Sequence, residues 1–251
     1  MKRESIIFTN EADWLNARKH DLTSTDIASL FGVGRKYPFE LYHMKKSLLD
    51  DDFEGNERTE WGLALQDAIM AKFAKDNSWE HRRMNEYIRI PELRIASSFD
   101  FEISYEDEVE GESFLNKEIV EIKNVDSLQL KENWLINEDG EYEATPAIEL
   151  QVQHQLLVSG YNTCRLCVCV GGNRGIHMVR KANPKIHSAI LERARIFWAS
   201  VESGIAPEPD YIEDAKFISK LYNTAEDDKV FDATVDHDIQ ALMSDYKKYK
   251  E

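Results

Sequence analysis

Helical and strand-like spacings of apolar residues succeed one another along the chain. Trp61, Leu65, Ile69 and Phe73 recur every four positions and predict a helix over residues 58–76. Similar spacing with capping residues predicts helices at 13–31 (two short ones), 39–49, 145–160 and 183–203, and alternation predicts strands at 85–91, 94–104, 117–125, 163–172 and 176–182. This order is typical of an α/β (α+β) fold in which a central mixed sheet lies between helices.

The length and polarity of the chain favour one large domain with an appendage. Its 251 residues are 42% hydrophobic and 10% aromatic, as in an ordinary globular protein. The acidic residues 50–57 interrupt the pattern as a solvated linker. We expect a single domain over residues 1–210, helical in its N-terminal part, and a C-terminal helical extension over residues 211–251.

Composition excludes several classes of protein. No apolar stretch is long enough to span a membrane, and the charged start lacks the form of a signal peptide, so we expect a cytoplasmic protein without membrane contact. Cys164, Cys167 and Cys169 share one predicted strand, and no further cysteine completes a metal set. The net charge of −16 argues against unspecific binding of nucleic acid by the whole surface. It leaves room for a narrow basic channel.

Charged residues interrupt two of the predicted strands. Asp100 is isolated among apolar neighbours in the first, and Glu121 and Lys123 occupy alternate positions of the next. Because residues i and i+2 share a face of a strand, Glu121 and Lys123 point the same way. Two carboxylates beside an ammonium group could bind a hard cation next to a proton-handling group, as metal-assisted phosphodiester hydrolysis requires. A solvated strand face with a cross-strand ion pair is the alternative.

Three glutamines on the predicted helices are further candidates. Gln66 interrupts an apolar stripe, so we expect its amide to point inward, either into a polar site or as a hydrogen-bonded core residue. Gln151 and Gln155 share one face of the helix at 145–160, where their amides could hold a water or a phosphate oxygen. A polar helix side in solvent is the alternative, and it fits Gln155 better than Gln151.

Taken in order, these motifs resemble those of the YqaJ-type phage recombination exonucleases, a lambda exonuclease-like family of the PD-(D/E)XK nuclease superfamily. The resemblance rests on SSFDFEI, VEIKN and LQVQHQLLVSG, on RKHDLTSTDI near the start, and on the Trp-Gly-x-x-Leu-x-x-x-Ile helix. It covers roughly residues 14–175. The ordered set is more specific than any one motif, and it implies a restriction-endonuclease-like PD-(D/E)XK core.

The resemblance implies a role for each residue of the metal and water site. Asp100, Glu121 and the backbone carbonyl of Ile122 correspond to ligands of Mg²⁺, for which Mn²⁺ can substitute. Lys123 corresponds to the group that orients or activates the attacking water. Gln151 corresponds to the glutamine that lies beside this water and the scissile phosphate.

The resemblance also implies a DNA-end site and one departure from the family pattern. Arg18 and Thr25 correspond to the arginine and serine that hold the 5′-terminal phosphate, and Thr25 keeps the hydroxyl. Gln66 stands where the family has a metal-binding glutamate, so the catalytic set includes an amide in its place. Asp67 lies about 100° further round the helix and is a poor substitute. The Pro-Asp dipeptide is lost, since Phe99 takes the place of proline.

The implied function is a Mg²⁺-dependent 5′–3′ exonuclease acting on linear duplex DNA ends in phage-type recombination by single-strand annealing. The resemblance also implies a homo-oligomer, such as a trimeric ring, and a single-strand annealing protein as partner. It further implies a phage or prophage gene that is expressed in the bacterial cytoplasm. The alternatives are another PD-(D/E)XK endonuclease of the RecB-like or restriction type, and a catalytically weakened module that binds DNA ends. An acidic globular protein without a nucleic-acid role is the plainest alternative. No Walker A sequence is present, which excludes a fused helicase motor in this chain.

Overall fold

The computed structural model describes most of the chain, whose contacts divide it into two units. One comprises residues 1–214 and the other residues 215–251. The described residues are 1–47, 55–109, 112–138, 141–222, 232 and 234–250. Of the regions expected from the sequence, residues 50–54 of the acidic linker and residues 223–231, 233 and 251 of the C-terminal extension lie outside the described residues.

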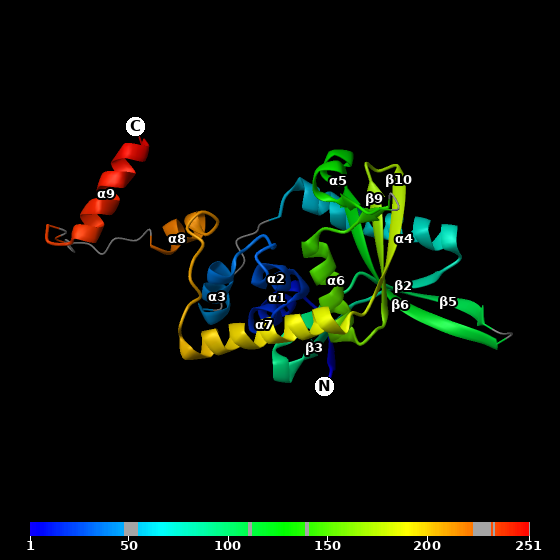
Figure 1. Ribbon diagram of the computed structural model, residues 1–251. Coiled ribbons are helices and arrows are strands. Elements are labelled where there is room, and N and C mark those ends of the chain that lie inside the picture. Colours follow the sequence, from blue (N-terminus) through cyan, green and yellow to red (C-terminus); the bar gives the residue numbers. More distant parts are fainter. Residues whose placement is uncertain (48–54, 110–111, 139–140, 223–231, 233, 251) are drawn as a thin grey trace. The chain divides into compact units, whose positions relative to one another are not determined.

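A mixed five-stranded sheet forms the centre of the first unit (Figure 1). Its strands are β2 (Glu80–Arg83), β5 (Phe101–Val109), β6 (Glu112–Val125), β9 (Thr163–Val170) and β10 (Arg174–Lys181). They follow the order β10-β9-β6-β5-β2, and neighbours are antiparallel except for the parallel pair of β6 and β9. The predicted class, a central mixed sheet flanked by helices, is confirmed.

The parallel pair requires a crossover that returns the chain to the same end of the sheet. The connection between β6 and β9 contains two helices and a short hairpin. These elements are α5 (Ser127–Asn133), β7 (Leu135–Ile136), β8 (Tyr142–Glu143) and α6 (Pro146–Ser159).

Helix α6 begins and ends where the sequence predicts. Thr145 is the N-cap, with its side chain accepting from the backbone N–H of Ile148, and Pro146 follows in the first turn. Gly160 ends the helix with a φ of 82°, a left-handed conformation that glycine adopts readily. These local signals place α6 between the two parallel strands in the chain.

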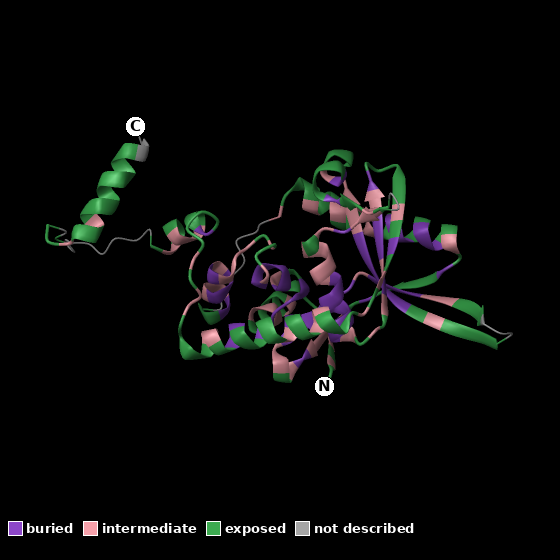
Figure 2. Cartoon of the chain, viewed as in Figure 1, coloured by how far each residue is buried: buried purple, intermediate pink, exposed green. Residues whose placement is uncertain are grey.

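Helices α4 (Glu57–Asn77) and α6 cover opposite faces of the sheet (Figure 1). On the α4 face, Val120 and Ile122 of β6 share a buried cluster with Phe73. On the α6 face, Ile119 shares a buried cluster with Val152. Figure 2 shows the resulting burial along the central strands. Alternate residues of β6 therefore belong to different layers of the fold.

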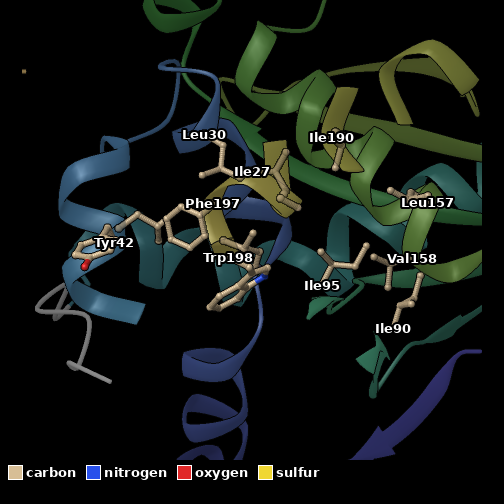
Figure 3. Close-up of a cluster of buried hydrophobic side chains, with 13 residues drawn as sticks. Ile27, Leu30, Tyr42, Ile90, Ile95, Leu157, Val158, Ile190, Phe197 and Trp198 are labelled. Atoms are coloured by element: carbon tan, nitrogen blue, oxygen red, sulfur yellow. The ribbon is translucent and has the colours of Figure 1, made fainter. Parts of the chain in front are cut away.

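A second core joins the N-terminal helices to α7 and to a small antiparallel sheet. Figure 3 shows its side chains, among them Phe197 and Trp198 of α7 gathered with Leu30 and Tyr42. Its buried residues come mainly from α2 (Ser24–Leu30), α3 (Pro38–Ser47), α6, α7 (Pro184–Ser203), β3 (Glu86–Ile90) and β4 (Ile95–Ser97). Strand β1 (Glu4–Ile7) completes the three-stranded sheet, a 3₁₀ turn lies at Pro91–Leu93, and α1 (Glu11–His20) precedes α2.

Asp100 lies where the chain passes from one sheet to the other. The single strand predicted at residues 94–104 is wrong, because it divides into β4 of the three-stranded sheet and β5 of the five-stranded sheet. Residues 98–100 belong to neither strand. Phe99 and Phe101 are both buried on either side of Asp100, so the apolar pattern continues through the junction without marking it.

The second unit contains two described helices, α8 (Ala215–Leu221) and α9 (His237–Lys250). None of its described residues is buried, and α9 exposes Leu242, Met243 and Tyr246. Across the described part of the whole chain, no helix combines the length and the apolar character needed to cross a membrane.

His154 of α6 is a buried titratable group in the first unit. Neither ring nitrogen has a hydrogen-bond partner among the described residues. Burial lowers the pKa of His154 from 6.5 to about 3. The unfolded chain therefore takes up a proton at this residue as the pH falls below 6.5, while the folded protein does not. Folding stability must decrease over that range.

We expect His154→Leu to weaken the pH dependence of stability. Between pH 7.5 and pH 5, the wild type should lose roughly 2 kcal/mol through this histidine, and the variant should not. Urea unfolding at the two pH values measures the loss. His20→Leu, at an exposed position, is the control and should keep the wild-type loss. Equal losses in the wild type and His154→Leu would contradict the role given to burial.

Candidate active site

Glu121 and Lys123 lie on the face of β6 that α6 covers. The Nζ of Lys123 donates to Oε1 of Glu121 at 2.6 Å. Glu121 is buried and Lys123 is half-buried. Val120 and Ile122 lie on the other face, in the cluster with α4. The alternation expected of this strand is therefore present.

Two glutamines of α6 donate to the same carboxylate. Nε2 of Gln151 lies 2.6 Å from Oε1 of Glu121, and Nε2 of Gln155 lies 2.7 Å from Oε2. Oε1 of Gln151 accepts from Nζ of Lys123 at 3.0 Å. The alternative in which Gln155 faces solvent is wrong, since Gln155 is 2% exposed on the helix side that packs on the sheet. Three donors therefore hold Glu121.

Asp100 approaches β6 from the junction between the two sheets. Its Oδ2 accepts from the backbone N–H of Ile122 at 2.8 Å, and its Oδ1 accepts from Nε2 of Gln66 at 3.2 Å. The bond to the backbone places the carboxylate beside residue 122. Asp100 thus lies next to the segment that carries Glu121 and Lys123.

Gln66 reaches Asp100 from α4, so its amide points inward. Nη1 of Arg83 donates to Oε1 of Gln66 at 3.4 Å, and Nη2 of Arg83 donates to Oδ1 of Asp67 at 2.7 Å. In this arrangement Gln66 presents its N–H group to Asp100 and its oxygen to Arg83. A half-turn of the amide exchanges the two, which is what ligation of a cation by the oxygen requires.

A pocket of about 370 Å³ extends from Gln151 to the N-terminal helices. Arg18 and Thr25 line it, and Nη2 of Arg18 lies 3.4 Å from Oγ1 of Thr25. Arg35 and Lys36 line it as well. The structure therefore brings together the two residues assigned to the DNA end, beside further basic residues, in a chain whose net charge is −16.

Gly34 allows the loop that carries the basic residues to lie close to α2. A Cβ at this position would come within 2.5 Å of the backbone nitrogen of Ser29. Backbone atoms cannot yield as the end of a flexible side chain can. Glycine is therefore required where this wall of the pocket meets α2.

The charges of the site act on one another. Burial, and then the charge of Glu121, raise the pKa of Asp100 to about 7, although the N–H of Ile122 and the charges of Lys123 and Arg83 oppose this rise. Burial disfavours the charge of Lys123, but Glu121 raises the pKa of its ammonium group through charge and a hydrogen bond. Lys123 is therefore a cation at neutral pH.

The carboxylates of Asp100 and Glu121 fit a divalent cation that needs few protein ligands. Asp100 and Glu121 would hold such a cation, and its charge would offset both the burial and the mutual repulsion that raise the pKa of Asp100. Within the described ranges, no group of three or more His, Cys, Asp and Glu side chains could hold a metal ion. Mg²⁺ commonly binds through one or two carboxylates and keeps several waters, which suits this pair.

The chain matches the family model of the YqaJ-like viral recombinase domain over residues 13–162. It belongs to this family. The YqaJ-like fold is shared with an alkaline exonuclease (LHK-Exo) from Laribacter hongkongensis, with a TM-score of 0.59, 16% identity, and coverage of 84% of this chain and 99% of that chain. LHK-Exo in complex with dAMP matches with the same values. A comparison with curated protein sequences finds no match.

One residue at the YqaJ-like site escaped prediction. Gln155 was a candidate from the sequence, because it lies one helical turn after Gln151 and shares its face. Arg83 had no such local signal. It meets the site only because β2 pairs with β5, with Arg83 opposite Phe101 and hence next to Asp100.

We expect Asp100→Asn to stabilise the metal-free protein at pH 8 while removing its response to metal. The wild type at this pH holds a carboxylate that burial and Glu121 disfavour, so the amide should raise the free energy of unfolding by about 1–2 kcal/mol in chelator. Saturating Mn²⁺ should stabilise the wild type by roughly 2–3 kcal/mol and the variant by little. Thermal unfolding in EDTA and in Mn²⁺ measures both effects.

Asp67→Asn provides the matched control, because Asp67 is exposed and pairs with Arg83. This variant should keep the wild-type response to Mn²⁺. A full Mn²⁺ response in Asp100→Asn would show that Asp100 is not a ligand.

Proposed function

We propose that this protein is a metal-dependent deoxyribonuclease that digests linear duplex DNA from its 5′ ends in phage-type recombination. The observation that supports this function best is the placement of Asp100, Glu121 and Lys123 around one segment of β6, with Gln151 leading into a basic pocket. Two carboxylates and an ammonium group suit phosphodiester hydrolysis, and the pocket suits a phosphate. Membership of a viral recombinase family agrees with this function.

Asp100 and Glu121, with the carbonyl of Ile122, would hold Mg²⁺ or Mn²⁺. When bound, the ion lowers the pKa of its water and neutralises charge on the phosphate. Gln155 orients the Glu121 carboxylate, and the N–H of Ile122 orients that of Asp100. Both carboxylates are therefore positioned before substrate binds, as electrostatic preorganisation requires.

Lys123 serves as a charged donor. Because its pKa is raised, its ammonium group does not take a proton from water at neutral pH. It would orient the attacking water and stabilise negative charge that develops on the phosphate oxygens. Gln151 accepts from Lys123 and donates to Glu121, so its amide can exchange either contact for a water or a phosphate oxygen.

Arg18 and Thr25 would bind the 5′-terminal phosphate. A guanidinium group donates to phosphate oxygens in a fork, and a hydroxyl adds a further donor. The same pocket reaches Gln151. Anchoring the 5′ end there gives the digestion its 5′–3′ direction.

The proposal extends to a trimeric ring around DNA and to a single-strand annealing protein that takes up the exposed strand. The net charge of −16 disfavours retention on DNA by attraction over the whole surface. A closed ring retains the enzyme by topology instead. The basic pocket then needs to bind only the strand end.

Linear and closed circular DNA separate this function from that of an endonuclease of the same superfamily. We expect the wild type to digest linear 5′-phosphorylated duplex in Mg²⁺ or Mn²⁺ and to leave closed circles intact. Lys123→Ala should reduce the rate by roughly 10²–10³, as loss of one preorganised donor does. Release of nucleotides, followed over time, measures both.

Lys117→Ala is the control for this experiment, because Lys117 is exposed on the same strand. It should keep the wild-type rate. Cutting of closed circles would favour the endonuclease. Equal product from the wild type and Lys123→Ala would remove Lys123 from the mechanism, and binding of ends without digestion would favour the weakened DNA-end module.

Gln66→Glu tests the departure from the family pattern. A carboxylate beside Asp100 should tighten Mn²⁺ binding by roughly tenfold, because affinity for hard cations rises with the number of charged ligands. Titration with Mn²⁺ measures the dissociation constant, and the rate at low metal concentration should rise with it. Unchanged affinity would mean that residue 66 is not a ligand.

A further inference from the structure

Lys45 of α3 is a buried lysine that the proposed mechanism does not use. Its side chain is 8% exposed. Its Nζ donates to the backbone carbonyls of Arg18 and Asp21, each at 2.7 Å, and pairs with Asp26 at 2.8 Å. The two carbonyls belong to the C-terminal end of α1, where helix carbonyls lack partners within the helix and attract cations. All three donors of the ammonium group are engaged.

Asp26 carries the link from Lys45 into α2. Its Oδ2 accepts from the N–H and Oγ1 of Thr23, at 2.9 and 2.8 Å, within the capping box of the helix. Oγ1 of Thr23 lies 3.2 Å from Oγ1 of Thr25. Burial disfavours ionisation of Asp26, but Lys45 lowers its pKa to about 2. Asp26 is therefore a carboxylate, and its contact with Lys45 joins the helix of Arg18 to the helix of Thr25.

The carboxylate of Asp21 anchors the same corner from the small sheet. Nη2 of Arg89 donates to Oδ1 of Asp21 at 2.8 Å, and the hydroxyl of Tyr87 donates to Oδ2 at 3.2 Å. Asp21 is 1% exposed. Lys45 therefore contacts the backbone carbonyl of Asp21, while Arg89 and Tyr87 fix the side chain of the same residue.

The hydrophobic core holds α3 in position for this contact. Leu41 and Tyr42, four and three positions before Lys45, are 1% and 2% exposed and belong to the cluster in Figure 3. Residues at this spacing share a face of the helix. Packing of α3 beside Phe197 of α7 therefore directs the ammonium group towards the end of α1.

We propose that Lys45 is a positioning residue that sets selectivity for 5′-phosphorylated DNA ends by holding Arg18 and Thr25 at the separation that one phosphate requires. This role rests on the proposed function, in which these two residues bind the phosphate. Lys45 is not among the residues that line the pocket, so it acts through them. A buried ion pair adds little net stability, because desolvation offsets its attraction, and its consequence here is geometric.

Lys45→Met tests this role, because methionine keeps an unbranched apolar stem and removes the ammonium group. Lys46→Met is the matched control: Lys46 is exposed and its Nζ donates to the hydroxyl of Tyr42. Each variant digests linear duplex carrying either a 5′-phosphate or a 5′-hydroxyl in Mg²⁺. The readout is the ratio of the two kcat/KM values. A loss of folded protein or of metal lowers both values together and leaves the ratio unchanged.

Lys45→Met should lower the ratio by roughly tenfold, the order expected when a charge-assisted contact to the phosphate is lost. The change should arise in KM for the phosphorylated end more than in kcat. Lys46→Met should keep the wild-type ratio. The affinity for Mn²⁺ should be the same in the wild type and in both variants.

Arg18→Ala separates this role from the function on which it rests. Three outcomes overturn the phosphate site and the role of Lys45 with it. Either the wild type digests neither DNA, or its ratio of kcat/KM values for phosphate over hydroxyl ends is near one, or Arg18→Ala leaves that ratio unchanged. A preference that depends on Arg18 and persists in Lys45→Met overturns the role of Lys45 alone. If Lys45→Met does not fold because Asp26 is left unpaired, Asp26→Asn with Lys45→Met removes both charges and is judged by the same ratio.

Discussion

The buried carboxylate of Glu121 is the constraint on which the site depends. Removing a carboxylate from water costs several kcal/mol (~5) unless donors or a cation compensate for it. Lys123 donates from the same strand, and Gln151 and Gln155 donate from α6. These contacts require α6 to lie along β6, which the crossover between the parallel strands β6 and β9 achieves. The chemistry of the site therefore depends on the topology of the sheet.

Elements with complete local signals could be predicted from the sequence, and elements defined by distant pairing could not. Helix α6 has its cap, its proline and its final glycine within one short stretch. The alternation of Glu121 and Lys123 likewise follows from the geometry of one strand. The division of residues 94–104 depends on which sheet each half joins, because Ile95 pairs with β3 and Phe101 pairs with β6. Apolar alternation is the same in either sheet.

The contacts within the site likewise depend on distant parts of the chain that local patterns do not reveal. Periodicity alone indicates that Gln66 points inward, but it does not identify which side chain it meets. The solvent-facing alternative for Gln155 fails because both faces of α6 are covered, one by the sheet and one by α2, so a polar residue there is not directed to solvent. Arg18 and Thr25 lie on different helices, and their proximity depends on the corner between α1 and α2, for which only the family resemblance offered a guide.

The two neighbours of Gln66 provide a physical reason for the amide at position 66. Nε2 of Gln66 donates to Asp100 and its Oε1 accepts from Arg83, whereas a carboxylate could only accept. The guanidinium group of Arg83 also pairs with Asp67 and lies 4.8 Å from the centre of the Phe101 ring. Arg83 and Lys123 therefore bring two positive charges to a site that holds the carboxylates of Asp67, Asp100 and Glu121. A carboxylate at position 66 would strengthen cation binding but would also repel the phosphates of DNA. In a chain of net charge −16, an amide at this position reduces that repulsion where the strand must approach most closely.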